Sequence, residues 1–142
     1  MIAIHKSKDF DLNDVIRRSD VEMLPDAPEI LKDCLFRSVE VRYGLIDGVV
    51  ACVWGLIPPT ILSDQAWLWL LTTNIVAEHK FLFIRHSQRY IEEALKEYPN
   101  IIGDVYIDNV PAKRWLKWLG AELFEPIGGK IPFVIKAKVL NG

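Results

Sequence analysis

Apolar positions in the first third of the chain change from a strand pattern to a helix pattern. The apolar run at residues 1–5 predicts a strand. Two short helices follow, the first capped by Asp9 or Asp11 and the second by Asp26. Two prolines, Pro25 and Pro28, separate the helices because proline does not fit inside one. The apolar positions at helical spacing are Phe10, Leu12, Val15 and Ile16, then Ile30, Leu31, Cys34 and Leu35.

The middle of the chain predicts three successive strands. Residues 39–44 alternate between apolar and polar side chains, which is typical of a strand with one solvent-facing side. Asp47-Gly48 then predicts a two-residue hairpin turn, in which both residues need positive φ. The segment Val49–Ile57 is almost wholly apolar and predicts a strand buried on both faces. After Pro58-Pro59, residues 66–71 form the third strand.

The last third returns to helices and then ends in strands. Apolar spacing predicts a long helix over residues 78–98, a strand over 101–107 and a short helix between Asn109 and Gly120. Residues 122–125 and 131–139 read as strands joined through Gly128-Gly129. The expected fold is therefore α+β, an α/β sandwich with a mixed twisted sheet of about seven strands in one domain spanning residues 1–142. The element order is β-α-α-β-β-β-α-β-α-β-β.

Composition narrows the class of protein. The chain has 142 residues, a net charge of −2 and no long basic tract, which argues against nucleic-acid and membrane partners. Cys34 and Cys52 lack metal or disulfide spacing and are expected to be buried free thiols, and no metal site is expected. The apolar run at the start of the chain is too short for a signal peptide. The apolar run at residues 66–71 is far shorter than the roughly 20 apolar residues that a membrane span needs. We therefore expect a soluble cytoplasmic protein.

The segment after the 101–107 strand carries a family signature. Asn109-x-x-Ala112 is followed eight residues later by Gly120. Together with the element order, this segment resembles the GNAT superfamily of acyl-CoA-dependent N-acyltransferases, over nearly the whole chain. A narrower set of residues looks like tailed-phage internal virion protein A-like proteins, whose location would be the bacterial host cell. That set comprises Trp67-Leu68-Trp69-Leu70-Leu71-Thr72-Thr73, Arg85-His86-Ser87 and Trp118-Leu119-Gly120-Ala121.

The resemblance implies acetyl-CoA as cofactor, with its pyrophosphate at the turn before the long helix. Family members usually have glycines in that turn, whereas residues 73–80 contain none. The expected cofactor-binding residues are Leu71, Thr72, Thr73, His79, Lys80, Asn109 and Ala112, with Lys80 as a point charge for phosphate. An ordinary loop capped by Thr73 or Asn74 is the alternative, and the nearby Glu78 favours it. Asn109 fits a helix cap alone as well as a cap that also contacts the cofactor.

The catalytic groups implied by the resemblance are partly missing. Leu116 stands where these enzymes often have the tyrosine that protonates the leaving thiolate, and leucine has no proton to give. Tyr106 is the nearest alternative acid, and water is another. Glu40 is the first candidate for the base that accepts the amine proton, and Asp64, Asp108 and His86 are further candidates.

Two functions follow from these residues. The first is acetyl-CoA-dependent N-acetylation of an amine on a small molecule or a protein. The second is a catalytically inactive protein-binding module, which acts in phage morphogenesis or host takeover if the phage resemblance holds. Trp115 and Trp118 neighbour each other on one short helix, and one of them suits contact with a protein partner or a second copy of the chain.

Overall fold

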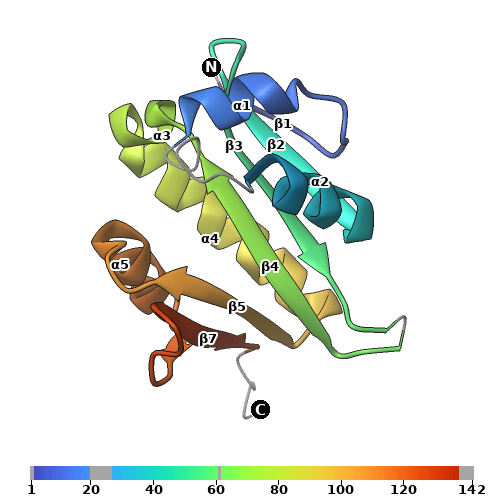
Figure 1. The fold of residues 1–142 in the computed structure, drawn as a ribbon, viewed down its shortest axis with the longest axis vertical. Helices are drawn as coiled ribbons and strands as arrows, with labels where there is room; N and C mark the ends of the chain where they lie inside the picture. Colours follow the sequence, from blue (N-terminus) through green and yellow to red (C-terminus); the bar gives the residue numbers. More distant parts are fainter. Residues whose placement is uncertain (1, 20–26, 61, 138–142) are drawn as a thin grey trace. The chain divides into compact units, whose positions relative to one another are not determined.

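The computed structural model describes residues 2–19, 27–60 and 62–137. The predicted Asp26 cap, residue 1 of the first strand and residues 138–139 of the last strand lie outside these ranges. The elements are β1 (Ile2–His5), α1 (Leu12–Arg18), α2 (Ala27–Arg37), β2 (Glu40–Ile46), β3 (Val49–Ile57), β4 (Gln65–Thr72), α3 (Asn74–Glu78), α4 (Lys80–Glu97), β5 (Asn100–Tyr106), α5 (Val110–Trp118), β6 (Glu122–Leu123) and β7 (Lys130–Lys136) (Figure 1).

The strands form one mixed sheet. Its order is β1-β2-β3-β4-β5-β7-β6. The described ladders are antiparallel except between β4 and β5, where Gln65, Ala66 and Trp67 pair in parallel with Asn100, Ile101 and Ile102. The α+β fold with a seven-stranded sheet confirms the prediction.

The chain divides into two compact units. Unit 1 comprises Met1–Ile57 and Leu68–Phe83, and unit 2 comprises Pro58–Trp67 and Ile84–Gly142. The strand β4 begins in unit 2 and ends in unit 1, and the helix α4 begins in unit 1 and continues in unit 2. Each unit is described below by itself.

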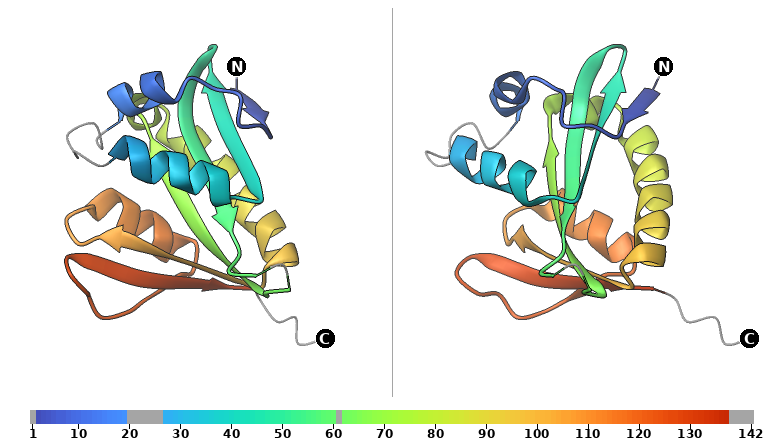
Figure 2. Two further views of the ribbon diagram at one scale, coloured as in Figure 1. Left: turned by 45° about the vertical axis from the view of Figure 1, so that its right-hand side comes forward. Right: turned by 90° about the vertical axis from the view of Figure 1, so that its right-hand side faces the viewer.

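Unit 1 is built around β3, whose residues 51–57 are all buried, as the unbroken apolar run predicts. The turn before it has positive φ at both central residues, 52° at Asp47 and 80° at Gly48, which confirms the predicted hairpin. The helices α1 and α2 lie on one face of β2 and β3 (Figure 2), and Asp11 caps α1 by accepting the Asp14 N–H. Of the two caps that the sequence allowed, Asp11 is therefore the one used.

A buried tryptophan fixes the packing of unit 1. Trp69 Nε1 donates to Ser38 Oγ at 2.7 Å, and Ser38 Oγ donates to the Cys34 carbonyl at 2.6 Å. The Trp69 ring lies directly against Gly55, where a Cβ atom would come within 2.5 Å of Nε1. The Trp69 indole thus links β4 to the residue that follows α2, and it can pack against β3 because Gly55 has no side chain.

In unit 2 the helix α5 ends as its sequence predicts. The Ala121 N–H donates to the Leu116 carbonyl and the Gly120 N–H to the Lys117 carbonyl, with Gly120 at φ 86°. This is the Schellman arrangement that a glycine after the last helical turn permits. Trp115 Nε1 also donates to Ser87 Oγ at 2.9 Å, which joins α5 to α4.

The C-terminal hairpin is partly as predicted. Gly128 and Gly129 have φ values of 59° and 83°, and Ile127 and Lys130 exchange backbone hydrogen bonds across the turn. The predicted strand over residues 122–125 is shorter, because only Glu122 and Leu123 pair with β7. Pro126 has no N–H to donate, so the regular backbone hydrogen bonding between the two strands is interrupted before the turn.

Both cysteines are buried free thiols, as expected. Burial raises the pKa of the Cys34 thiol, and it raises the pKa of the Cys52 thiol from 9.0 to about 12. The described helices include none that is long and apolar enough to cross a membrane.

The Cys52 thiol predicts a loss of stability at alkaline pH. Above pH 9 the unfolded chain loses this proton, while the folded protein keeps it until about pH 12. The unfolded state is therefore stabilised relative to the folded state as pH rises. We expect the free energy of unfolding of the wild type to fall relative to Cys52→Ala by up to about 1.4 kcal/mol per pH unit in this window. Urea denaturation at pH 8.5 and 10.5 measures the difference, and parallel behaviour of the two proteins would contradict the prediction.

Candidate functional site

The end of β4 forms a tight corner in unit 1. The sequence predicts a loop over residues 73–80 and a helix from residue 78. The loop prediction is wrong for residues 74–78, which are helical. The structure has a separate one-turn helix, α3, and a break at His79, which has a non-helical φ of −132° and ψ of 45° before α4 begins at Lys80. The Thr73 side chain caps α3, and this local hydrogen bond supports a helix that starts at Asn74, four residues before the start that the apolar periodicity indicates. We call residues 71–80 the β4–α4 corner.

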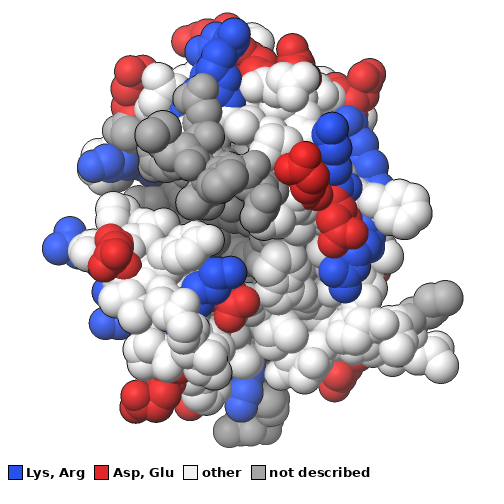
Figure 3. Space-filling view, viewed as in Figure 1, with Lys and Arg blue, Asp and Glu red and all other residues white. Residues whose placement is uncertain are grey.

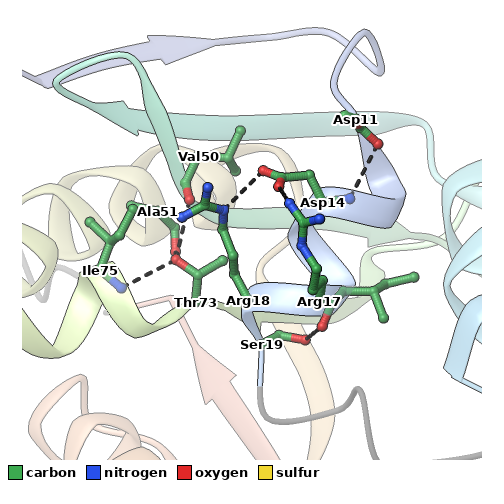
Figure 4. Close-up of polar contacts among 10 residues, drawn as sticks. Asp11, Asp14, Arg17, Arg18, Ser19, Val50, Ala51, Thr73 and Ile75 are labelled. Carbon is green, nitrogen blue, oxygen red and sulfur yellow. Dashed lines mark hydrogen bonds and ion pairs between the residues drawn. The ribbon is translucent and has the colours of Figure 1, made fainter.

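Thr73 is the anchor of the β4–α4 corner. Its N–H and its Oγ1 both donate to the Ala51 carbonyl at 2.9 Å, and Oγ1 accepts the Ile75 N–H at 3.4 Å (Figure 4). The side chain is only 5% exposed. These contacts assign Thr73 the cap that the sequence also allowed, whereas a cofactor contact of Thr73 stays a prediction.

The other predicted cofactor residues of the β4–α4 corner differ in accessibility. Leu71 is buried, Thr72 and His79 are half-buried, and Lys80 is exposed. Within the described residues Lys80 forms no ion pair. The corner therefore presents an ammonium group that no described acidic residue pairs with, at the start of α4 and next in sequence to a half-buried imidazole.

The structure adds arginines to this corner that the sequence did not indicate. Ser19, directly after α1, forms an isolated antiparallel bridge with Thr73. Arg18 precedes it, and its Nε donates to Asp14 Oδ2 at 3.0 Å, while Arg17 pairs with Asp14 Oδ1 (Figure 4). Partial desolvation raises the pKa of the Asp14 carboxyl, but the hydrogen bonds and charges of Arg17 and Arg18 outweigh it, so that this pKa lies below its ordinary value.

Glu40 lies elsewhere in unit 1, at the start of β2. Its Oε1 accepts from Arg42 Nη2 at 2.8 Å and lies 3.3 Å from Lys6 Nζ. The carboxylate is thus held between two cations. Its role as a general base stays a prediction, and an amine nitrogen would have to reach an oxygen that already has these partners.

Unit 2 holds the remaining predicted residues near α5. Asn109 Oδ1 accepts the Ala112 N–H at 3.2 Å, which confirms the predicted cap. Tyr106, at the end of β5, is half-exposed, with Lys130 Nζ 5.3 Å from its ring centroid. Leu116 is only 2% exposed and belongs to the core, whereas Trp118 is 52% exposed. The acid role of Tyr106 and the cofactor contacts of Asn109 and Ala112 stay predictions.

The cap at Asn109 predicts a measurable contribution to stability. Asn109→Ala removes the acceptor of the Ala112 N–H, so we expect the free energy of unfolding to fall by about 1 kcal/mol. Asn109→Asp keeps an acceptor and should lose less. Urea denaturation of the three proteins measures this, and equal losses in both variants would contradict the cap.

The further base candidates lie at scattered positions. Asp64 precedes β4, Asp108 lies in the turn after β5, and His86 lies half-buried on α4. In the described part of the chain, no group of three or more His, Cys, Asp or Glu side chains could hold a metal ion. Acidic and basic side chains are interspersed on the face drawn in Figure 3, without a broad basic surface there.

Comparison with known proteins places the fold in one class. No protein-family model matches the sequence, and no curated protein does. Solved structures match over almost the whole chain. An acetyltransferase of Bacillus subtilis in complex with CoA has a TM-score of 0.72 at 12% identity, covering 97% of this chain and 100% of that one. The ribosomal-protein-S18-alanine N-acetyltransferase of Escherichia coli has a TM-score of 0.69 at 14% identity, covering 99% and 98%.

A third match also contains the cofactor. An N-acetyltransferase of Campylobacter jejuni in complex with acetyl coenzyme A has a TM-score of 0.62 at 12% identity, covering 97% of this chain and 100% of that chain. The chain therefore has the fold of the GNAT acetyltransferases. At these identities the likeness establishes the fold.

Proposed function

We propose that the protein is an acetyl-CoA-dependent N-acetyltransferase that acts on an amine. The observation that carries the proposal is the match of the whole chain, end to end, with acetyltransferases whose structures contain CoA or acetyl-CoA. The anionic phosphates of such a cofactor suit the β4–α4 corner in charge, because Lys80 is exposed there without an ion-pair partner among the described residues.

In this proposal each predicted site residue has a role in cofactor binding or in proton transfer. Lys80, His79 and Thr72 bind phosphate, with Leu71 at the end of the strand, and Thr73 holds the corner in shape. Asn109 and Ala112 are the other proposed cofactor-binding residues, and the cofactor would supply an acetyl thioester. The amine nitrogen forms an amide bond to the acetyl carbon, and the carbon–sulfur bond breaks. Glu40 accepts the proton that the amine loses, and Tyr106 or water gives one to the departing thiolate. Positioning supplies most of the rate enhancement.

The reaction is tested by release of free thiol. The protein is incubated with acetyl-CoA and a panel of primary amines, including polyamines, amino acids and peptides with a free N-terminus. We expect thiol release above the hydrolysis rate with at least one amine, and an acetylated product of matching mass. If no amine gives product while the protein still binds acetyl-CoA, the catalytic proposal is wrong and a cofactor-binding protein remains.

A second function is favoured by Leu116 and Trp118. The family's acid position holds a buried leucine, and the same helix carries a half-exposed tryptophan. An inactive module that binds a protein or a second copy of itself through Trp118 accounts for both. Sedimentation velocity of the wild type and Trp118→Ala tests self-association, and two monomers of equal mass would exclude the homodimer. The tailed-phage branch and the cytoplasmic location stay predictions.

A further inference from the structure

The C-terminal end of α1 is joined to the β4–α4 corner. The antiparallel bridge between Ser19 and Thr73 sets the backbone of these two residues side by side. Arg18 is the last residue of α1 and Asn74 the first residue of α3, so the bridge brings the end of α1 next to the start of α3, although the two segments are far apart in the sequence.

Arg18 is held in place but keeps donors for a ligand. Its Nε is bound to Asp14, and among the described residues its two terminal nitrogens have no hydrogen-bond partner. The side chain is 38% exposed, against 68% for Arg17. In Figure 4 Arg18 is drawn between Thr73 and Asp14, with Arg17 further from Thr73. One carboxylate faces two guanidinium groups (−1 + 2), so the cluster of Asp14, Arg17 and Arg18 carries a net charge of +1.

A diphosphate at the β4–α4 corner would need such a cation. The segment of the corner from residue 73 to 80 lacks glycine, and Thr73 already caps the Ile75 N–H, so the backbone has little to offer a phosphate. Side-chain cations have to supply the attraction instead. α3 has five residues and is therefore about 7.5 Å long. Arg18 directly precedes Ser19, which is bridged to the Thr73 cap of α3, and Lys80 lies just beyond the other end of α3. Arg18 and Lys80 thus place one cation at each end of α3, and a diphosphate carries negative charge on both of its phosphates.

We propose that Arg18 binds a phosphate of the diphosphate group of acetyl-CoA, in place of the glycine-rich backbone turn. The proposal rests on the proposed function, since it concerns the same cofactor. A guanidinium group donates two parallel hydrogen bonds to phosphate oxygens, and its fixed fork makes these bonds geometrically specific. Asp14 orients Arg18 for this contact, and Ser19 ties it to the corner.

Calorimetric titration with acetyl-CoA tests the proposal, using the wild type, Arg18→Gln and the matched control Arg17→Gln. Both variants lose one charge and one Asp14 contact. We expect Arg18→Gln to raise Kd about 10-fold or more, because it loses hydrogen bonds to a charged group. Arg17→Gln should stay within about 2-fold, in line with exposed charges. The salt dependence of Kd between 50 and 300 mM NaCl should become shallower in Arg18→Gln only.

The outcomes separate the two proposals. If the wild type binds acetyl-CoA and Arg18→Gln binds it equally well, Arg18 is not a phosphate ligand and the proposed function is unaffected. If the wild type binds no acetyl-CoA, both proposals fail. If Arg18→Gln does not fold, as judged by circular dichroism, Arg18→Lys replaces it. Lysine keeps the charge but loses the fork, so Kd should rise about threefold or more, and an unchanged Kd would overturn the proposal.

Discussion

Replacing Gly55 with alanine is expected to lower the free energy of unfolding by about 3–5 kcal/mol. The new Cβ would lie 2.5 Å from Nε1 of Trp69 and 2.7 and 2.8 Å from Cε2 and Cζ2 of the same ring. Buried atoms cannot approach so closely, so the indole has to move. Moving it breaks the buried hydrogen bond to Ser38, which leaves a polar N–H without a partner. Urea denaturation followed by tryptophan fluorescence measures the loss.

Gly44 provides the matched control for Gly55. It also lies on a strand of unit 1, but a Cβ there would meet Cys52 Sγ at 3.5 Å and the Trp54 ring at 3.8 Å, which are ordinary contacts. Gly44→Ala should therefore change the free energy of unfolding by less than about 1 kcal/mol. If Gly55→Ala is no more destabilising than Gly44→Ala, the close packing of Trp69 on β3 is wrong.

Replacing Leu116 with alanine is expected to cost about 2–5 kcal/mol of stability, the range for a fully buried leucine. Leu116 is one of the largest completely buried side chains, and its carbonyl also accepts the Ala121 N–H that ends α5. Truncation leaves a cavity beneath a helix that Trp115 and Ser87 hold in place, so the helix cannot easily collapse into it. Urea denaturation measures the free energy of unfolding.

Leu116→Met serves as the control, because it preserves volume and should cost less than about 1.5 kcal/mol. A loss in Leu116→Ala as small as that in Leu116→Met would show that this position is not part of the core. A large loss would instead show that Leu116 has a structural role in the core.

Local chemistry explains which elements were predictable. Asp47-Gly48 determines its own turn through positive φ, and Asn109 and Gly120 determine the two ends of α5 through a cap and a Schellman arrangement. The buried strand β3 follows from an unbroken apolar run. In each case the residues that define the element are neighbours in the sequence, so its physical cause can be recognised there.

The remaining features depend on contacts between distant segments. The α3 helix exists because Thr73 caps it while Ala51, on another strand, holds Thr73 in place. No periodicity in residues 73–80 indicates that contact. Arg18 likewise becomes a neighbour of the β4–α4 corner only through the bridge between Ser19 and Thr73. The glycine-free sequence drew attention to the corner and to Lys80, but only the folded chain brings Arg18 close to it.

Direct binding of acetyl-CoA is the most decisive measurement for the account as a whole. Calorimetric titration of the wild-type protein should give a saturable heat with one site per chain and a Kd below about 1 mM, the upper range for enzyme substrates. A rise in thermal midpoint at the same cofactor concentrations should accompany it, because a ligand that binds the folded state stabilises that state. No heat and no thermal shift at millimolar acetyl-CoA would contradict the account and leave a GNAT fold without the acetyl-CoA chemistry proposed for it.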